Sequence, residues 1–99
     1  MIGKNDFIRA LNILIDKPGM YGVNKVEDIQ NFVTAEIFFN RNKIIEDWSG
    51  RFSDFTIKTL NDSMINFTWC KLIRLYSGSD SHSIELFRDI FEQFNNSDI

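Results

Sequence analysis

The residues of this chain that could do hydrolytic chemistry gather around His82, its only histidine, which has Asp80, Ser81 and Ser83 beside it. A Ser-His-Asp site needs the imidazole held in space between a nucleophilic hydroxyl and an orienting carboxylate. Here the serines and the aspartate are immediate sequence neighbours at the start of a predicted helix, where both residue types are common because they cap free backbone N–H groups. We therefore interpret residues 80–83 as a helix cap or surface segment.

Metal and cofactor chemistry would need groups that this sequence lacks. One His and one Cys, Cys70, cannot form a standard zinc ligand set, and we expect Cys70 to be a small packing residue. The adjacent carboxylates Glu27-Asp28 and Glu46-Asp47 point in different directions on a helix, so neither is an acid–base pair by itself. The sequence has no glycine-rich phosphate loop. It therefore predicts no enzyme activity, no cofactor and no metal site.

Three acidic residues of the predicted C-terminal helix are the best candidates for a partner-binding surface. Glu85, Asp89 and Glu92 are spaced i, i+4, i+7 and lie opposite the apolar stripe of that helix. Glu46 and Asp47 are the next candidates. A solvated helix face is the plain interpretation of the three; the alternative is a recognition surface for a protein with a basic face.

The composition favours one helical domain that spans residues 1–99. Ten Phe, two Trp and two Tyr supply an aromatic core, and a single Pro leaves long stretches without a helix breaker. The net charge of −3 argues against binding to nucleic acid, because that binding depends on clustered Lys and Arg. No stretch approaches the ~20 apolar residues of a membrane span, and no leader pattern opens the chain, so we expect a cytoplasmic protein that does not bind membranes.

Apolar residues recur at helical spacing in several stretches, which predicts an all-α fold: a bundle of four or five helices around the aromatic core. We expect the first helix from an Asn5 cap to Ile15, with Ile13 exposed because it falls off the stripe. The second is expected behind an Asn24–Glu27 capping box and to reach at least Phe38.

Three further helices are expected in the second half of the chain. One begins at a Ser53 cap and runs through Asn61, and the next is capped by Ser63 or Asn66. We expect Trp69 to be buried because it leads the most regular stripe. The inward residues of the last two helices are Trp69, Leu72, Ile73 and Tyr76, then Ile84, Phe87, Phe91 and Phe94.

The segment from residue 37 to 51 allows three interpretations. Ile37, Ile44 and Trp48 fit a continued second helix with Gly50 just beyond its end, which we favour. Alternatively, the polar run Asn40–Asn42 separates that helix from a short one over residues 43–48, or the β-favouring runs on either side form a hairpin.

A tight turn is predicted at Lys17-Pro18-Gly19-Met20-Tyr21. Pro18 presets the φ of the second turn position, and Gly19 is expected to take the positive φ of a type II turn. We expect Met20 and Tyr21 to fold back between the first helix and the remainder; the competing interpretation is an exposed binding motif.

The phenylalanines of the middle of the chain are too many for simple inward-facing stripes. These residues are Phe38, Phe39, Phe52, Phe55 and Phe67. We expect most of them to fill the core, and any that remain outside to form an apolar patch of the kind that marks a partner or dimer surface.

In the order of its motifs, the chain resembles a family of small bacterial proteins. Members open with an amphipathic helix and a Lys/Arg-Pro-Gly-Met-Tyr motif, matched by residues 17–21, followed by a capped helix similar to Asn24–Val33. A Phe-x-x-Trp/Phe helix and a Trp-x-x-(Ile/Leu)-Ile segment are matched by residues 52–55 and 69–73, and an acidic, Phe-rich helix is matched by residues 86–94. The Gly-Tyr pair expected after Val33 is missing, and residues 37–51 match no motif of the family.

Relatives of this kind are often suspected immunity proteins of bacterial toxin systems. The resemblance therefore implies a noncatalytic protein that binds and neutralises a cognate toxin, and it carries over no catalytic residue. The alternative is a small regulatory or adaptor module that binds another protein through the same acidic surface.

Overall fold

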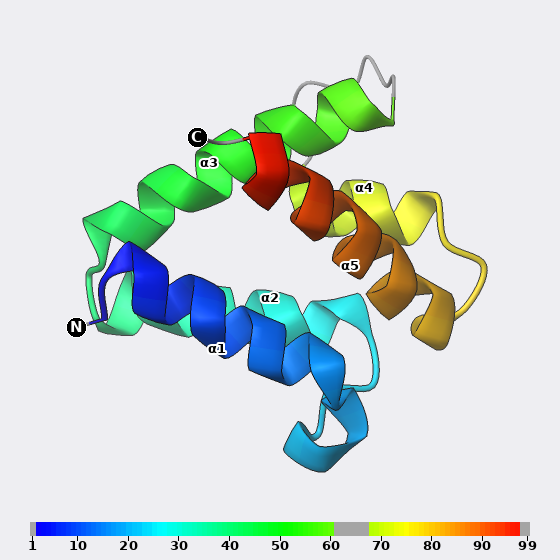
Figure 1. Cartoon of the computed structure of the whole chain (residues 1–99), viewed down its shortest axis with the longest axis horizontal. Helices are drawn as coiled ribbons and strands as arrows, with labels where there is room; N and C mark the ends of the chain where they lie inside the picture. The colour runs from blue at the N-terminus through cyan, green and yellow to red at the C-terminus, as the bar shows by residue number, and fades with distance from the viewer. Residues whose placement is uncertain (1, 61–67, 98–99) are drawn as a thin grey trace.

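The computed structural model describes residues 2–60 and 68–97 of the chain, and within these ranges every regular element is helical. This confirms the predicted all-α fold with an aromatic core. Figure 1 shows the arrangement, which measures 33 × 29 × 25 Å along its principal axes. The elements are α1 (Lys4–Asp16), the 3-10 turn η1 (Pro18–Tyr21), α2 (Val26–Thr34), the π-helical segment η2 (Ala35–Phe39), α3 (Lys43–Thr59), α4 (Trp69–Leu75) and α5 (Asp80–Ser97).

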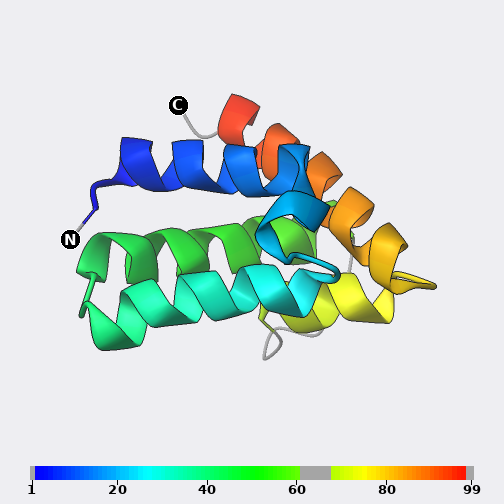
Figure 2. The same cartoon turned by 90° about the horizontal axis from the view of Figure 1, so that it is seen from below.

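The helices enclose one hydrophobic core because each buries its apolar stripe against several others. The long helix α3 contacts α1, α4 and α5, while α2 packs on α4 and α5. Figure 2 shows α1 and the end of α5 forming one side of the molecule, with α2, α3 and α4 on the other. The short α4 therefore lies behind α5 in Figure 1, held between α2 and α3.

Phe52 of α3 lies at the centre of the aromatic core. Its ring stacks on Trp48 with a centroid distance of 5.0 Å and an interplanar angle of 13°. Further aromatic neighbours of Phe52 are Trp69, Phe87, Phe91 and Phe94. Trp69 is fully buried, as its stripe predicts, and Ile84, Phe87, Phe91 and Phe94 of α5 are buried as well. Tyr76 is exposed, however, because α4 ends one residue before it.

Two helix starts are capped by serines from other helices. Ser53 of α3 accepts a hydrogen bond from the backbone N–H of Trp69 at 3.1 Å, at the start of α4. Ser83 of α5 accepts one from the N–H of Val26 at 3.0 Å, at the start of α2. The prediction that Ser53 begins a helix is thus wrong, since its hydroxyl caps a helix that is distant in sequence.

The other predicted caps also differ from the structure. Gly3, not Asn5, is the cap residue of α1, and it supplies no side-chain hydrogen bond. The predicted Asn24–Glu27 box is wrong because Asp28 takes the role of the acidic residue: its carboxylate accepts from the N–H groups of Asn24 at 2.8 Å and Lys25 at 3.3 Å. The predicted caps Ser63 and Asn66, as well as the predicted helix end Asn61, lie outside the described residues.

The favoured continuous helix through residues 37–48 is wrong. The second helix passes into the π-helical η2 and ends at Phe39, and the break at Asn40–Asn42 is the alternative that the structure adopts. Asn42 then caps α3 by accepting from the N–H of Ile45 at 3.3 Å. α3 does not stop at Gly50 but continues to Thr59, because Ile45, Trp48, Phe52 and Thr56 form one buried stripe.

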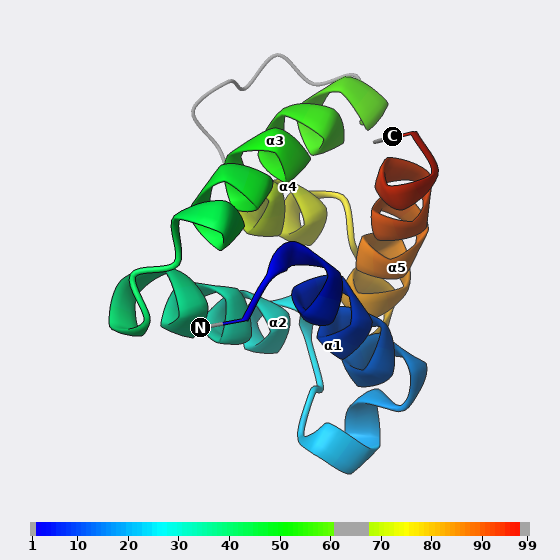
Figure 3. The ribbon, with the colours of Figure 1, turned by 60° about the vertical axis from the view of Figure 1, so that its left-hand side comes forward.

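The Pro-Gly segment forms a turn of a different type from the one predicted. Pro18–Tyr21 is a turn of 3-10 helix in which Gly19 does not have a positive φ; Gly22 does, at 73°. The N–H of Val23 donates to the carbonyl of Pro18 at 2.9 Å and closes the turn. Tyr21 is 50% exposed and Met20 is 69% exposed, so the expectation that they plug the core is wrong. Figure 3 shows η1 projecting away from the bundle.

Replacement of Trp69 by alanine tests the central role of the aromatic core. Because the indole is fully buried, we expect Trp69→Ala to lower the free energy of unfolding by ~3–5 kcal/mol, measured by urea denaturation. The matched control is Ile13→Ala on the exposed side of α1, which should change it by less than ~0.5 kcal/mol. A loss below ~1 kcal/mol for Trp69→Ala would contradict the assignment.

Candidate binding surfaces

The residues around His82 act as helix-capping groups. The Nδ1 atom of the His82 ring accepts a hydrogen bond from the backbone N–H of Gly78 at 3.0 Å. The backbone N–H of His82 donates to the Oγ of Ser79 at 3.1 Å. The hydroxyl of Ser83 donates to the carbonyl of Asp80 at 2.6 Å while it accepts from Val26. The predicted helix start is present, but Ser79 rather than a residue of 80–83 accepts the capping hydrogen bond from the His82 backbone, and the buried Ser83 caps α2 instead. Across residues 2–60 and 68–97, no group of three or more His, Cys, Asp or Glu side chains is placed to hold a metal ion.

Cys70 is a packing residue, as expected. Its side chain is buried on α4, and this burial raises the pKa of the thiol to about 11. A thiol with so high a pKa is protonated at neutral pH and is a poor nucleophile.

An ion-pair cluster joins three helices at Arg74 of α4. Its guanidinium donates to both carboxylate oxygens of Glu27 on α2, at 2.6 and 2.9 Å, and to Asp80 of α5 at 3.0 Å. The hydrogen bond from Arg74 is the main reason that the pKa of Glu27 falls from 4.5 to about 2. Sequence reasoning missed this cluster because Glu27 and Arg74 are 47 positions apart, beyond any local spacing rule.

The acidic candidates on α5 are exposed, as predicted. Glu85, Asp89 and Glu92 all lie on the surface, and none of them forms an ion pair with a residue in the described parts of the chain. Arg88 lies between them in sequence, but its guanidinium donates to the backbone carbonyl of Ile15 at the end of α1. Because the last turn of α1 has no basic residue of its own, Arg88 supplies the cation that favours a helix C-terminus.

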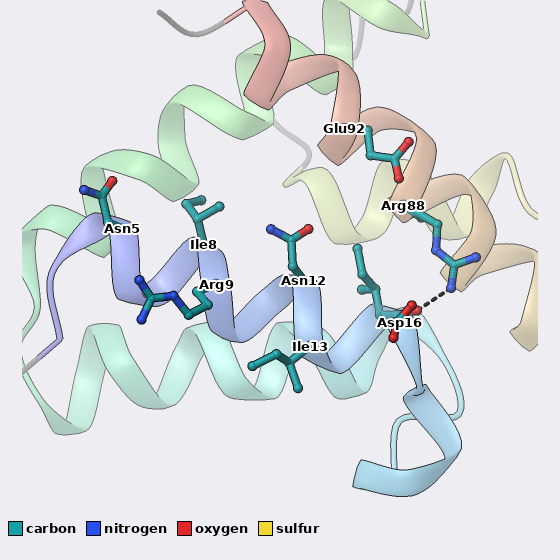
Figure 4. A pocket seen from close by; sticks show the side chains of 9 residues that line it. Asn5, Ile8, Arg9, Asn12, Ile13, Asp16, Arg88 and Glu92 are labelled. Atoms are coloured by element: carbon teal, nitrogen blue, oxygen red, sulfur yellow. Dashed lines mark hydrogen bonds between the residues drawn. The ribbon is translucent and has the colours of Figure 1, made fainter.

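A groove of about 720 Å³ runs between α1 and α5, bordered by Glu92. Figure 4 shows Asn5, Ile8, Arg9 and Asn12 along α1, with Glu92 on the neighbouring α5 and Arg88 reaching from α5 to the end of α1. The groove is lined by apolar, amide and charged side chains of both signs.

The second acidic pair lies on a different part of the molecule. Glu46 and Asp47 are exposed in the first turns of α3, and Glu46 pairs with Lys43 at 3.7 Å. α3 begins at the left of Figure 1, whereas α5 begins at the lower right. The structure therefore does not bring Glu46 and Asp47 together with Glu85 into one surface.

A second exposed surface lies where η2 turns into α3; we call Phe38, Phe39, Arg41 and Ile44 the aromatic corner. Phe38 is 71% exposed and Phe39 84% exposed, and Ile44 is exposed beside them in sequence. Arg41 has a φ of 50°, the one positive value outside glycine in the described residues. The sequence indicated that some phenylalanines would lie outside, but not which ones: Phe52 is buried, Phe55 is partly buried, and Phe67 lies outside the described residues.

Polar side chains hold the backbone of the aromatic corner in place. The buried Asn42 donates to the carbonyl of Ile2 at 2.9 Å and caps α3 with its Oδ1 atom. Glu36 accepts from the amide of Asn40 at 3.0 Å and from that of Asn42 at 3.4 Å. The corner is therefore tied both to the first residues of the chain and to the start of α3.

None of the described helices is long and apolar enough to cross a membrane. Comparison of the chain with protein-family models, curated proteins and solved structures finds no match.

The shifted pKa of Glu27 predicts a pH-dependent stability. Since the pKa is lower in the folded chain, the contribution of the carboxylate is complete above pH 4.5 and is lost as the pH falls toward 2. We expect Glu27→Gln to have a lower urea midpoint than the wild type at pH 7, with the difference shrinking through this acid range. The difference in urea midpoint caused by Glu27→Gln should also shrink in an Arg74→Met background, because the ion-pair partner of Glu27 is then absent. A midpoint difference that is constant from pH 7 to pH 2 would contradict the assignment.

Proposed function

We propose that this chain is a noncatalytic, cytoplasmic binding protein of the immunity type, which neutralises a cognate bacterial toxin by protein–protein contact. The observation that carries the proposal is the exposed acidic face of α5. Glu85, Asp89 and Glu92 have no ion-pair partner in the described residues, and Arg88, the nearest cation in sequence, is bound to α1. Like charges at helical spacing destabilise a helix slightly, so a basic partner would gain from neutralising them.

Two further observations support a binding role over catalysis. The residues with the types of a hydrolytic site, His82 and Ser83, are engaged in capping hydrogen bonds, and Cys70 is buried with a raised pKa. The resemblance of residues 17–21, 52–55 and 69–73 to motifs of suspected immunity proteins adds the toxin as partner. An adaptor module that binds another protein is the second candidate, because an acidic surface fits it equally.

Co-expression with the protein encoded immediately upstream tests this function. If that protein is the cognate toxin, cells that also make this chain should survive toxin induction, and the two proteins should co-purify because neutralisation requires contact. Survival no better than with an empty vector would contradict the immunity role. Co-purification without protection would favour the adaptor role.

Charge reversal on α5 tests the acidic face separately. We expect Glu85→Lys combined with Asp89→Lys to slow association with the upstream protein, measured by surface plasmon resonance, with the effect diminishing at high salt. Thermal unfolding should be unchanged because both side chains are exposed. The matched control for the single variant Asp89→Lys is Asp54→Lys, an exposed acid of α3 outside both candidate sets. Equal association rates for Asp89→Lys and Asp54→Lys would exclude the face from the contact.

A further inference from the structure

We infer that the aromatic corner is a second contact surface of this chain, and that it inserts Phe38 and Phe39 into an apolar pocket of the partner protein that has a carboxylate at its rim. This inference rests on the proposed binding function and deepens it by naming the chemistry of the partner. Two adjacent phenylalanines, Phe38 and Phe39, are 71% and 84% exposed, so a large apolar area is in contact with water. Exposed apolar patches of this kind mark contact surfaces.

The backbone of the corner is unusual in two ways that coincide with the exposed rings. Phe38 and Phe39 end a π-helical segment, a conformation that is rare and concentrates at functional sites. Two residues later, Arg41 adopts a left-handed φ of 50°, which costs free energy for a residue with a Cβ atom. Rare backbone geometry therefore coincides with the exposed rings, which is a pattern found at binding sites.

The corner is also preorganised. Asn42 is only 1% exposed, and its amide holds the carbonyl of Ile2 while its oxygen caps α3. Glu36 accepts from both Asn40 and Asn42, so η2 is joined to the start of α3 by side chains as well as by the chain. A rigid surface loses little conformational entropy on association, and this raises the affinity that two aromatic side chains can supply.

The charge of Arg41 favours an occupant that offers a carboxylate. Arg41 forms no ion pair with the parts of the chain that the structure describes, and Phe and Arg together are residue types enriched at interface centres. A carboxylate at the rim of the partner's pocket would accept a charge-assisted hydrogen bond from the guanidinium of Arg41. A membrane fits less well, because Glu46 and Asp47 are exposed in the adjoining turns of α3 and would be repelled by anionic lipid.

The test uses the full chain and the upstream protein, with binding measured by isothermal titration calorimetry. Phe38→Ala combined with Phe39→Ala should weaken binding by at least about 30-fold, as expected for central aromatic contacts. Arg41→Asn removes the charge but tolerates the left-handed backbone, and it should weaken binding by about 10-fold. The controls are Leu75→Ala, an exposed apolar residue of α4, and Lys58→Asn, an exposed cation of α3; each should leave affinity within about 2-fold. Thermal unfolding of the corner variants should match that of the wild type or exceed it for Arg41→Asn.

Each other outcome overturns the inference in a distinguishable way. Wild-type affinity in the Phe38→Ala, Phe39→Ala double variant overturns the corner and leaves the proposed function standing. Absence of binding by the unaltered chain overturns both. Sedimentation of the wild type, but not of the double variant, with phosphatidylcholine–phosphatidylglycerol vesicles identifies a membrane as the occupant. A dimer of the unaltered chain that the double variant lacks, detected by analytical ultracentrifugation, identifies a second copy.

Discussion

The fold depends on the packing of aromatic rings around Phe52. Through Trp48, this cluster extends to Phe7 of α1, at a centroid distance of 4.8 Å, and Phe7 in turn stacks on Phe32 of α2 at 5.8 Å. With Trp69 on α4 and the phenylalanines of α5, the connected rings reach all five described α-helices. Each aromatic pair adds ~0.5–1.5 kcal/mol beyond the burial of its area, and a shift of one helix would disturb several pairs together. The constraint explains how 99 residues with one proline and no possible internal disulfide hold a defined arrangement.

This inner constraint leaves the surface free to carry exposed groups that do not help the fold. The acidic face of α5 lies opposite a stripe that is fixed by Phe87, Phe91 and Phe94. The aromatic corner follows directly on a helix whose Val26, Ile29 and Val33 are buried. Side chains on the outer sides of such elements can change without loss of the core, which would suit the proposed binding role.

Helical periodicity predicted the fold class, most inward residues and the start of a helix near residue 80, because these follow from spacing along one helix. It failed where a residue's role is set by a distant part of the chain. The local sequence around Ser53 indicates a helix start, yet the hydroxyl of Ser53 accepts a hydrogen bond from the backbone N–H of Trp69. The local sequence places Glu27 in a capping box, yet its carboxylate accepts hydrogen bonds from the guanidinium of Arg74. The exposed acids of α5 were predictable because exposure follows from the helical face. The particular phenylalanines of the aromatic corner were not, because the π-helical segment shifts the register of the side chains that follow it.

The two serines that cap from other helices affect how the chain can acquire its structure. A seven-residue helix such as α4 is too short to persist alone in water, and its first N–H group is satisfied only when α3 is already beside it. α2 depends on α5 in the same way, across 57 positions of sequence. Loss of such a cap costs roughly 1 kcal/mol, so a chain that lacks α5 has a weakened start of α2. Secondary and tertiary structure are therefore coupled at both helix starts, because each gains its cap only when a distant helix has packed beside it.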